Sequence, residues 1–415
     1  MKRDLTQNIR ERINNSGKNR FFYGRKGAQP MSVLGIVAEY DPFHNGHLFH
    51  LRSAMEAVSP SAVLVALSGP FKQRGEIALL SPFVRAECAL SSGADAVFML
   101  PSLWTVRDAE HYALGAVSLL ASLGATHLAF GAENADLSLL QQTADLLEDS
   151  PEKLTAELHR ELSLGKGYPA ALSAAVGACI PESRELLNHA NNILAVCYLR
   201  AIRRLNLSVT PVVIPRFGSY HAAVPFPSSP SASSIRDSLC RGNWSPALSC
   251  LPEVSSNAVL TSFRFGRIPS RQSVDSLLLN KLRSMSAEQI SRLPDCSEGL
   301  ETAVSKAAAE SFSREELIAR LTGRRYSSSR ISRLCACVLL DLTREQVDYA
   351  PLPSGVLLLG IKKNPSLTGS WKNGPVQVLT ASKWHNVADP ADLAAWRLWC
   401  QACGFSASYP FTQRI

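Results

Sequence analysis

The sequence predicts an α/β fold in which a doubly wound parallel sheet is followed by a mainly helical C-terminal region. Three observations lead to this prediction. Short apolar runs rich in β-branched residues alternate with amphipathic stretches from residue 32 to residue 214, as expected for parallel strands joined by helical crossovers. This alternation stops near residue 250, and the later residues have mainly helical periodicity. A length of 415 residues also exceeds that of one ordinary domain.

The N-terminal elements follow one another in the order that a parallel sheet requires. Apolar runs such as AVLVAL and AVFML predict buried strands at residues 32–38, 62–67, 96–100, 127–130 and 208–214. Amphipathic spacing predicts the intervening helices at residues 48–57, 82–92, 107–123, 137–147, 151–164 and 193–205.

The second half of the chain has a different pattern. Residues 225–234 are rich in Pro and Ser and predict a surface loop. Helical periodicity then dominates residues 274–342, two apolar runs at 355–361 and 376–380 predict a small terminal sheet, and residues 391–402 predict a last helix. We therefore expect three parts: a basic extension at 1–30, a nucleotide-binding domain at 31–250 and a mainly helical domain at 251–415.

The positive charge of the chain is concentrated at its N-terminus. The formal net charge is +8, but residues 1–30 hold eight basic and two acidic side chains, which leaves the remaining 385 residues close to neutral, at +2. These residues predict a disordered extension, or a chain whose start is Met31; a basic arm that contacts RNA is the alternative. The 46% hydrophobic and 19% charged composition excludes a wholly disordered or coiled-coil protein.

Several classes of protein are not expected from this sequence. It has no apolar run of about eighteen residues, and the first thirty residues lack the apolar core of a secretory signal. We therefore expect a cytoplasmic protein with no membrane partner and with its ten cysteines as free thiols. Cys400 and Cys403 form an isolated CxxC pair without a second pair of ligands, so we predict no protein metal site.

The motif that indicates chemistry follows the first predicted strand. The segment GIVAEYDPFHNGHLFH, residues 35–50, leads from that strand through an HxGH sequence into a helix. Ligands of an open parallel sheet bind beyond the carboxyl ends of the strands, where a helix N-terminus attracts anions. His44 and His47 are one helical turn apart and can both donate to phosphate oxygens, while Gly46 permits close approach of the ligand. We therefore predict a nucleotide site here, with surface or capping histidines as the alternative.

This segment resembles the HxGH signature of nucleotidyltransferases, and its longer form resembles the bacterial tRNA(Met) cytidine acetate ligase family. The resemblance covers roughly residues 34–340. It continues through motifs at residues 67–69, 71–76, 93–95, 130–133, 191–194, 231–236, 325–326 and 329–331, and through Arg216 with Tyr220 and His221. It implies a Rossmann-like doubly wound sheet. It also implies an enzyme that converts acetate and ATP into acetyl-adenylate and transfers the acetyl group to N4 of the wobble cytidine of elongator tRNA(Met).

The resemblance also implies particular site residues, cofactors and partners. His44 and His47 are the expected catalytic residues, and ATP is the expected co-substrate, with Mg²⁺ accompanying it. The expected partners are elongator tRNA(Met), ATP and acetate, with no stable protein partner. The expected ATP-binding residues are Val37, Ala38, Glu39, Tyr40, Asp41, Pro42, Phe43, His44, Asn45, Gly46, His47, Leu48, Phe49, His50, Gly131, Asn191 and Arg216.

Two further segments have less certain roles. The SASSIR sequence lies where other nucleotidyltransferases carry a phosphate loop, so Ser233, Ser234 and Arg236 are candidates for contact with the triphosphate, with a plain helix cap as the alternative. Arg74 could hold acetate, tRNA or only Glu76. The sequence departs from the family pattern at a few positions, so the detailed shape of the pocket is in question. Asp41 stands where the family has Asn, and the other departures are Pro70, Phe71, Ile77, Ala132, Ala190 and Ala195.

A tRNA ligand needs local clusters of basic side chains, because the body of the chain is nearly neutral. Two clusters with neighbouring aromatic residues are candidates, although solvated basic helix faces would look the same. They comprise Arg264 and Arg267 in one, and Arg320, Arg324, Arg325, Arg330 and Arg333 in the other.

Two alternative functions stay open at this point. The chain could be an adenylyltransferase that acts on a small phosphorylated metabolite, or a nucleotide-dependent RNA-binding protein without catalytic activity. The long C-terminal extension disfavours the first alternative, and the intact HxGH motif disfavours the second.

Overall fold

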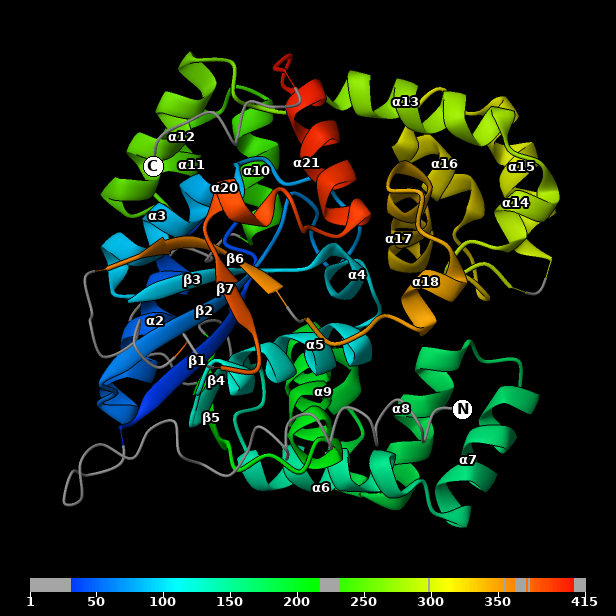
Figure 1. The fold of residues 1–415 in the computed structure, drawn as a ribbon. Coiled ribbons are helices and arrows are strands. Elements are labelled where there is room, and N and C mark those ends of the chain that lie inside the picture. Colours follow the sequence, from blue (N-terminus) through cyan, green and yellow to red (C-terminus); the bar gives the residue numbers. More distant parts are fainter. Residues whose placement is uncertain are drawn as a thin grey trace.

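The computed structural model describes residues 31–216, 231–297, 299–353, 355–362, 371 and 374–406. A seven-stranded sheet, in the order β5-β4-β1-β2-β3-β6-β7, carries helices on both faces (Figure 1). The predicted α/β class with a doubly wound parallel sheet is confirmed. The predicted extension at residues 1–30, Tyr220 and His221 lie outside the described residues.

The strands match the predicted apolar runs closely. Five of them, β1 to β5, pair in parallel, and β1 pairs with β2 on one side and with β4 on the other. The chain therefore changes direction across the sheet between β1 and β4, which is where ligands of such sheets bind. The strands are β1 (Val33–Ala38), β2 (Ala62–Ser68), β3 (Ala96–Leu100), β4 (His127–Ala132), β5 (Thr210–Pro215), β6 (Gly355–Ile361) and β7 (Gln377–Leu379).

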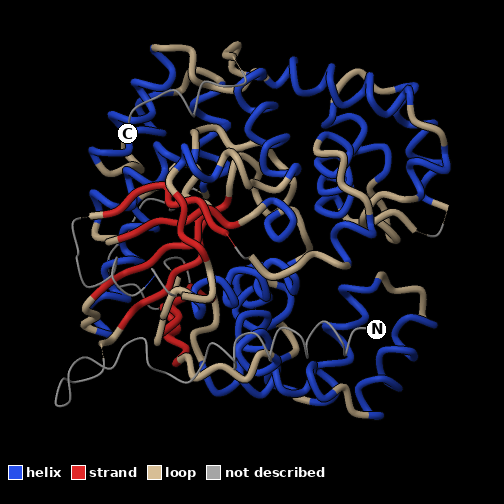
Figure 2. Tube along the Cα trace, viewed as in Figure 1, coloured by secondary structure: helices blue, strands red, loops and turns tan. Residues whose placement is uncertain are grey.

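Helices make up most of the remaining described residues, and the C-terminal half is largely helical as predicted (Figure 2). In the N-terminal part they are α2 (Asn45–Val58), α3 (Pro82–Ser92), α4 (Ser102–Thr105), α5 (Ala109–Ser122), α6 (Leu137–Asp149), α7 (Glu152–Ser163), α8 (Tyr168–Cys179) and α9 (Ala190–Arg204), with 3₁₀ turns at Pro181–Ser183 and Leu186–Asn188. The later helices are α10 (Ala232–Cys240), α11 (Trp244–Leu248), α12 (Glu253–Arg264), α13 (Arg271–Ser284), α14 (Ala287–Ser291), α15 (Leu300–Glu310), α16 (Arg314–Leu321), α17 (Ser328–Leu339), α18 (Arg344–Asp348), α20 (Ala381–Trp384) and α21 (Pro390–Ala402).

Alternate residues of the strands point into two separate cores. In β2, for example, Leu64 and Ala66 join the core under α5 and α9, whereas Val63 and Val65 join the core under α2 and α3. This alternation is the period of two that a strand imposes on its side chains. It explains why the strands are apolar throughout, because both faces of the sheet are covered by helices.

The two C-terminal strands were expected to form a small sheet of their own, and this expectation is wrong. Strand β6 pairs antiparallel with β3, and β7 pairs parallel with β6, so both extend the main sheet. The open edge of β3 offers unpaired backbone groups that β6 satisfies. Gly360 lets β6 lie close to helix α3, because a Cβ at this position would lie 2.6 Å from Cδ1 of Leu90 on that helix. The sheet therefore contains strands from both sides of residue 250.

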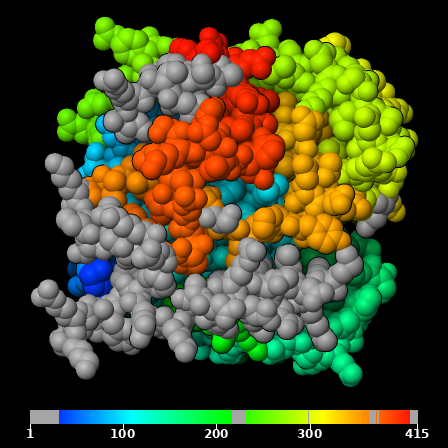
Figure 3. All heavy atoms as spheres, viewed as in Figure 1, coloured from blue at the N-terminus to red at the C-terminus, as the bar shows by residue number. Residues whose placement is uncertain are grey.

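The C-terminal segments lie across the N-terminal part of the molecule. On the face drawn in Figure 3, the orange and red C-terminal residues lie between cyan residues of the N-terminal part and the yellow-green residues of the helical region around α13. Trp396 of α21 is fully buried in the core under α2 and α3, and Trp399 donates to the carbonyl of Ala78 at 2.9 Å. Among the described residues, no helix combines the length and apolar character needed to span a membrane.

A fully buried arginine fixes the edge of the sheet where the site lies. Arg85 of α3 donates to the carbonyls of Glu39, Gly69 and Leu80 and to the hydroxyl of Ser68. Glu39 follows β1 and Gly69 follows β2, so one guanidinium holds the ends of both strands. Such a five-donor group can satisfy several carbonyls that would otherwise be buried without partners.

Replacing Arg85 by Met should lower the free energy of unfolding by roughly 3–5 kcal/mol, because several buried acceptors lose their donor. Urea unfolding followed by circular dichroism measures this change. Arg52→Met, on the exposed face of α2, is the matched control and should change stability by less than about 0.5 kcal/mol. Equal effects of the two substitutions would contradict the structural role of Arg85.

Candidate functional site

The HxGH segment forms the turn between β1 and α2 and the start of that helix. His44 is the N-cap of α2: its Nδ1 accepts from the backbone N–H of Gly46 at 3.1 Å, and its own N–H donates to Nδ1 of His47 at 3.3 Å. The helix therefore begins at Asn45, three residues before the predicted start. The reciprocal capping by two imidazoles replaces the usual Ser and Glu of a capping box.

The same hydrogen bonds set the protonation of the two rings. Because Nδ1 of His44 accepts a hydrogen bond, the proton of the neutral ring lies on Nε2, which can donate to a ligand. The two rings stack with their centroids 3.7 Å apart. Burial, together with the Arg216 guanidinium, lowers the pKa of His44 to about 4, and burial and the neighbouring His44 lower the pKa of His47 well below its ordinary value. Both rings are therefore neutral at pH 7, and a hydrogen bond to the backbone of Pro42 only partly offsets the lowered pKa of His47.

A cavity of about 400 Å³ lies above this turn, at the carboxyl edge of β1 and β4. Most of the predicted ATP-binding residues line it together: Val37, Ala38, Glu39, Tyr40, Asp41, His44, Gly46, His47, Phe49, His50, Gly131, Asn191 and Arg216. Of the candidate phosphate loop, Ser233 and Arg236 also line it. The predicted residues that do not line it are Pro42, Phe43, Asn45, Leu48 and Ser234.

One side of the cavity is built from β4, α9 and the end of β5. Arg216 donates to Oδ1 of Asn191 at 2.7 Å, and Nδ2 of Asn191 donates to Glu133 at 2.5 Å. Asn191 lies in the first turn of α9, whose N-cap is His189. A Cβ at Gly131 would lie 3.3 Å from Cγ of Arg216. These residues form one surface to which a nucleotide can bind.

The opposite side of the cavity contains a cluster of buried charges. The carboxylate of Asp41 accepts from the N–H groups of Leu79 and Leu80, both at 3.0 Å, and lies 3.5 Å from Nζ of Lys72. Burial opposes ionisation, but Lys72 and the arginines around it hold the pKa of Asp41 below its usual value. The departure from the family's Asn at this position thus adds a negative charge that the surrounding cations balance.

Glu76 connects this cluster to helix α10. Its Oε2 accepts from Lys72 at 2.5 Å and from Arg236 at 2.9 Å. Burial opposes the effect, but Lys72 and Arg236 lower the pKa of Glu76 to about 2. Arg236 also donates to the carbonyl of Asp41 at 2.8 Å and to Ser233 at 3.1 Å. The N-cap of α10 is Ser231, so the SASSIR segment both caps the helix and faces the cavity.

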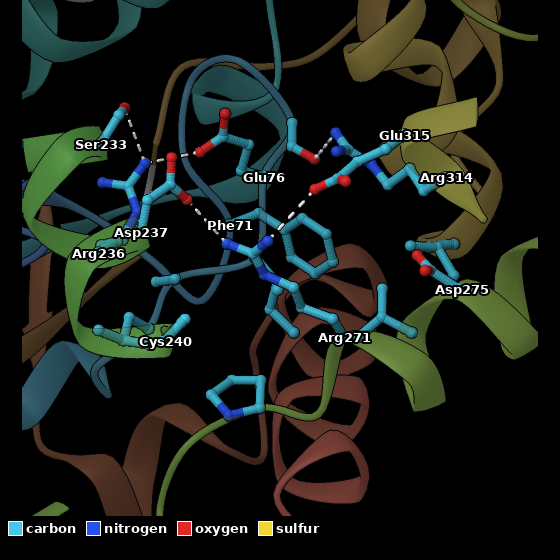
Figure 4. A pocket seen from close by; sticks show the side chains of 17 residues that line it. Phe71, Glu76, Ser233, Arg236, Asp237, Cys240, Arg271, Asp275, Arg314 and Glu315 are labelled. Carbon is cyan, nitrogen blue, oxygen red and sulfur yellow. Dashed lines mark hydrogen bonds and ion pairs between the residues drawn. The ribbon is translucent and has the colours of Figure 1, made fainter. Parts of the chain in front are cut away.

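The loop of residues 72–76 is a tight turn in which the backbone N–H of Lys72 donates to the carbonyl of Glu76 and that of Gly75 donates to the carbonyl of Lys72. Lys72 is therefore buried while Arg74 is exposed at the cavity, and Glu76 pairs with Lys72 and Arg236. The outer side of the turn contacts the C-terminal helices. Arg314, labelled in Figure 4, donates to the carbonyl of Gly75 at 3.1 Å. The hydroxyl of Ser332 donates to the carbonyl of Arg74.

The sequence interpretation did not identify Arg85 or Arg314 as site residues. Arg85 lies three and four residues before Cys88 and Ala89, on the buried face of α3. A charged residue at a buried position of the apolar pattern is a signal that could have identified it. Arg314 has no such signal, because it lies at the start of α16 and reaches the loop only through tertiary packing.

The structure separates the predicted RNA-binding arginines into a group at the exposed surface and a group that pairs with other residues of the chain. Arg264 and Arg267 lie 5.7 and 5.4 Å from the ring centroid of Phe265, which is 57% exposed, and Arg324 and Arg325 are exposed. The other three have intramolecular partners: Arg320 pairs with Glu310 and Glu316, Arg330 donates to Asp295 and Ser297, and Arg333 is buried beside Asp295.

No group of three or more metal-ligating side chains occurs within the part of the chain that the structure describes. All ten cysteines are free, and Cys400 is buried.

The fold and the site define a nucleotidyltransferase of the HxGH class, and residues 31–386 match the family described as HIGH Nucleotidyl Transferase. The tRNA(Met) cytidine acetate ligase of Syntrophomonas wolfei subsp. wolfei is 37% identical over 326 residues, 77% of this chain and 78% of that protein. That of Bacillus velezensis is 34% identical over 383 residues, 89% and 92% of the two chains. The chain belongs to the tRNA(Met) cytidine acetate ligase family, and is thus an enzyme of the ligase class.

The fold is also similar to a solved structure of Thermotoga maritima TmcAL bound with alpha-thio ATP. The TM-score is 0.81 at 28% sequence identity, and the match covers 90% of this chain and 95% of that chain. An ATP analogue is therefore a known ligand of a protein with the same fold.

Lowering the pH from about 6.5 to 4 should reduce the free energy of unfolding. An unfolded histidine binds a proton near pH 6.5, whereas folded His44 and His50 bind theirs only near pH 4, so protons favour the unfolded chain in this interval. His50→Leu removes one of these histidines. The free energy of unfolding should then fall less steeply with decreasing pH, by up to about 1.4 kcal/mol per pH unit.

Urea unfolding at half-unit pH steps measures this slope. His159→Leu, an exposed position on α7, is the matched control and should leave the slope unchanged. If His50→Leu also leaves it unchanged, His50 does not contribute to the acid sensitivity of the fold.

Proposed function

We propose that this chain joins acetate to the wobble cytidine of elongator tRNA(Met) at the expense of ATP. The observation that carries the proposal is that His44 and His47, at the start of α2, line one cavity with Gly131, Asn191 and Arg216. We call it the nucleotide cavity. The names of its relatives and the ATP analogue in the Thermotoga maritima structure support the same function. The cytoplasm, where tRNA is available, is the proposed site of action.

The adenosine part of ATP is assigned to the side of the cavity formed by β4, β5 and α9. Gly131 has no side chain to obstruct a purine or ribose, and Asn191 and Arg216 offer polar contacts. The α-phosphate then lies at the N-terminus of α2, where the backbone dipole and the Nε2–H group of His44 favour negative charge. The triphosphate extends toward Ser233 at the start of α10. Mg²⁺ is expected to arrive with these phosphates.

Two displacement steps complete the proposed reaction. An acetate oxygen attacks the α-phosphorus, the bond to the β-phosphate oxygen breaks, and pyrophosphate leaves with the electron pair. The N4 amine of cytidine then attacks the acetyl carbon, the bond from that carbon to the AMP oxygen breaks, and N4 releases a proton to water. The first step needs mainly positioning and charge stabilisation, which neutral imidazoles and a helix N-terminus supply without covalent participation.

The tRNA surface is assigned to the exposed basic side chains of the C-terminal half. Arg264 and Arg267 around the exposed ring of Phe265 offer phosphate contacts beside a stacking platform. Arg324 and Arg325 are exposed in the connection between α16 and α17, and α17 contacts the 72–76 turn of the nucleotide cavity. This arrangement would bring an anticodon loop close to the adenylate.

Incubation with ATP, labelled acetate and an elongator tRNA(Met) transcript should give N4-acetylcytidine. His47→Ala should lower acetate-dependent ATP–pyrophosphate exchange by at least roughly 100-fold, because the enzyme then loses a ring that lines the cavity and holds His44 in place. His159→Ala, on the exposed face of α7, should retain full exchange. Transfer of AMP to a phosphorylated metabolite, with no acetylated tRNA, would refute the proposal in favour of an adenylyltransferase.

Replacing both Arg324 and Arg325 by Gln should weaken tRNA binding and reduce its salt dependence by about one unit of log–log slope for each arginine that binds a phosphate. Acetate-dependent pyrophosphate exchange should not change, because neither side chain lines the nucleotide cavity. Filter binding over a range of salt concentrations measures the slope. Arg292→Gln, an exposed arginine that pairs with Glu288, is the control; loss of exchange in the double variant would contradict this division of roles.

A further inference from the structure

A second cavity, of about 330 Å³, adjoins the nucleotide cavity (Figure 4). It lies between the loop that follows β2, helix α10 and the C-terminal helices α13 and α16. Glu76, Ser233 and Arg236 line both cavities. The ion pair between Glu76 and Arg236 therefore forms the boundary between the two, and a molecule in the second cavity would lie beside the nucleotide, on the side of the C-terminal helices.

The lining of this cavity suits a planar polar ring. Figure 4 displays the ring of Phe71 among carboxylates and guanidinium groups of several elements, with Arg271 and Arg314 on the helical side. Asp275 of α13 adds a half-buried carboxylate, and burial raises its pKa. A bare phosphate would be repelled by these carboxylates, of which Glu76, Asp237 and Glu315 already pair with Arg236 or Arg271.

One oxygen of Glu76 is available at the boundary. Lys72 and Arg236 both donate to Oε2, and Oε1 takes part in none of the hydrogen bonds found among the described residues. The side chain of Glu76 is 41% exposed. Burial opposes ionisation, but Lys72 and Arg236 lower the pKa of Glu76 to about 2, so the carboxylate is ionised at pH 7 and can only accept hydrogen bonds.

Among pyrimidines, cytosine complements the Glu76 carboxylate and the neighbouring Arg236 guanidinium, and uracil does not. Its exocyclic N4 amine donates, while its N3 and O2 accept, so a carboxylate beside a guanidinium complements its edge. Uracil presents a carbonyl oxygen in place of the amine, which would oppose the carboxylate. A base flipped out of a single-stranded loop could be read in this way between a polar pair and an aromatic ring.

We propose that this second cavity binds the cytosine that accepts the acetyl group, with Oε1 of Glu76 accepting from its N4 amine. The inference rests on the proposed function and adds the location and chemistry of the acceptor site. The amine at the shared wall then faces the acetyl carbon of the adenylate. As N4 bonds to that carbon, the acyl carbon–oxygen bond to AMP breaks and the amine proton passes to water.

Cys240 provides a test, because it is exposed and lines the second cavity but not the nucleotide cavity. Cys240→Trp should fill the cavity and lower acetyl transfer to tRNA roughly 100-fold or more, while acetate-dependent pyrophosphate exchange stays within about twofold of the unsubstituted enzyme. Cys240→Ser introduces no bulk and serves as the control. Full acetyl transfer by Cys240→Trp, with exchange intact, would overturn the proposal.

A second measurement uses the unsubstituted chain and does not depend on turnover. N-ethylmaleimide labels Cys240, and peptide mass spectrometry follows the rate with an anticodon stem-loop RNA that carries C or U at the wobble position. The C-containing RNA should slow labelling at least threefold more than the U-containing RNA. Equal protection by the two RNAs would overturn the proposal. Cytosine-specific protection without any acetylated product would instead refute the proposed function and retain the binding site.

Discussion

The site depends on a single buried carboxylate. Asp41 follows β1 and is 1% exposed, so its charge requires partners within the protein. It obtains them from the N–H groups of Leu79 and Leu80 and from the cations of Lys72 and Arg236. Those partners belong to the loop after β2 and to α10. One charge thereby fixes the positions of the HxGH turn, the 72–76 turn and the candidate phosphate loop relative to one another.

The histidines of the cavity add no further charge to this cluster. Burial, with nearby Arg216, keeps His44 and His50 neutral at pH 7, so these imidazoles contribute no formal charge. The cations Lys72 and Arg236 already neutralise Asp41 and Glu76. The cavity thus does not carry a large uncompensated positive charge.

Much of the nucleotide side could be predicted from the sequence because its determinants are local. The strand, turn and helix around residues 33–58 follow from apolar periodicity, and the HxGH spacing places both imidazoles on one turn. The pairing of β6 with β3 could not be predicted, because periodicity identifies a strand but not its neighbour. The inward orientation of Arg330 and Arg333 also depends on a distant partner, the segment at Asp295 and Ser297. An arginine-rich sequence is the same whether its side chains face RNA or a carboxylate of the same chain.

The 72–76 turn shows why the C-terminal helices belong to the chemistry of the site. Its inner side presents Lys72 and Glu76 to the nucleotide cavity, while a Cβ at Gly75 would lie 2.5 Å from the carbonyl oxygen of Ser332. Arg314 donates to the carbonyl of Gly75 on that outer side. The turn is thus held between Asp41 and helices α16 and α17, with no room for a side chain at its tip. In the reaction proposed above, a shift of these helices on tRNA binding would move Glu76, which lines both cavities, and the same turn would position the acceptor base and the adenylate.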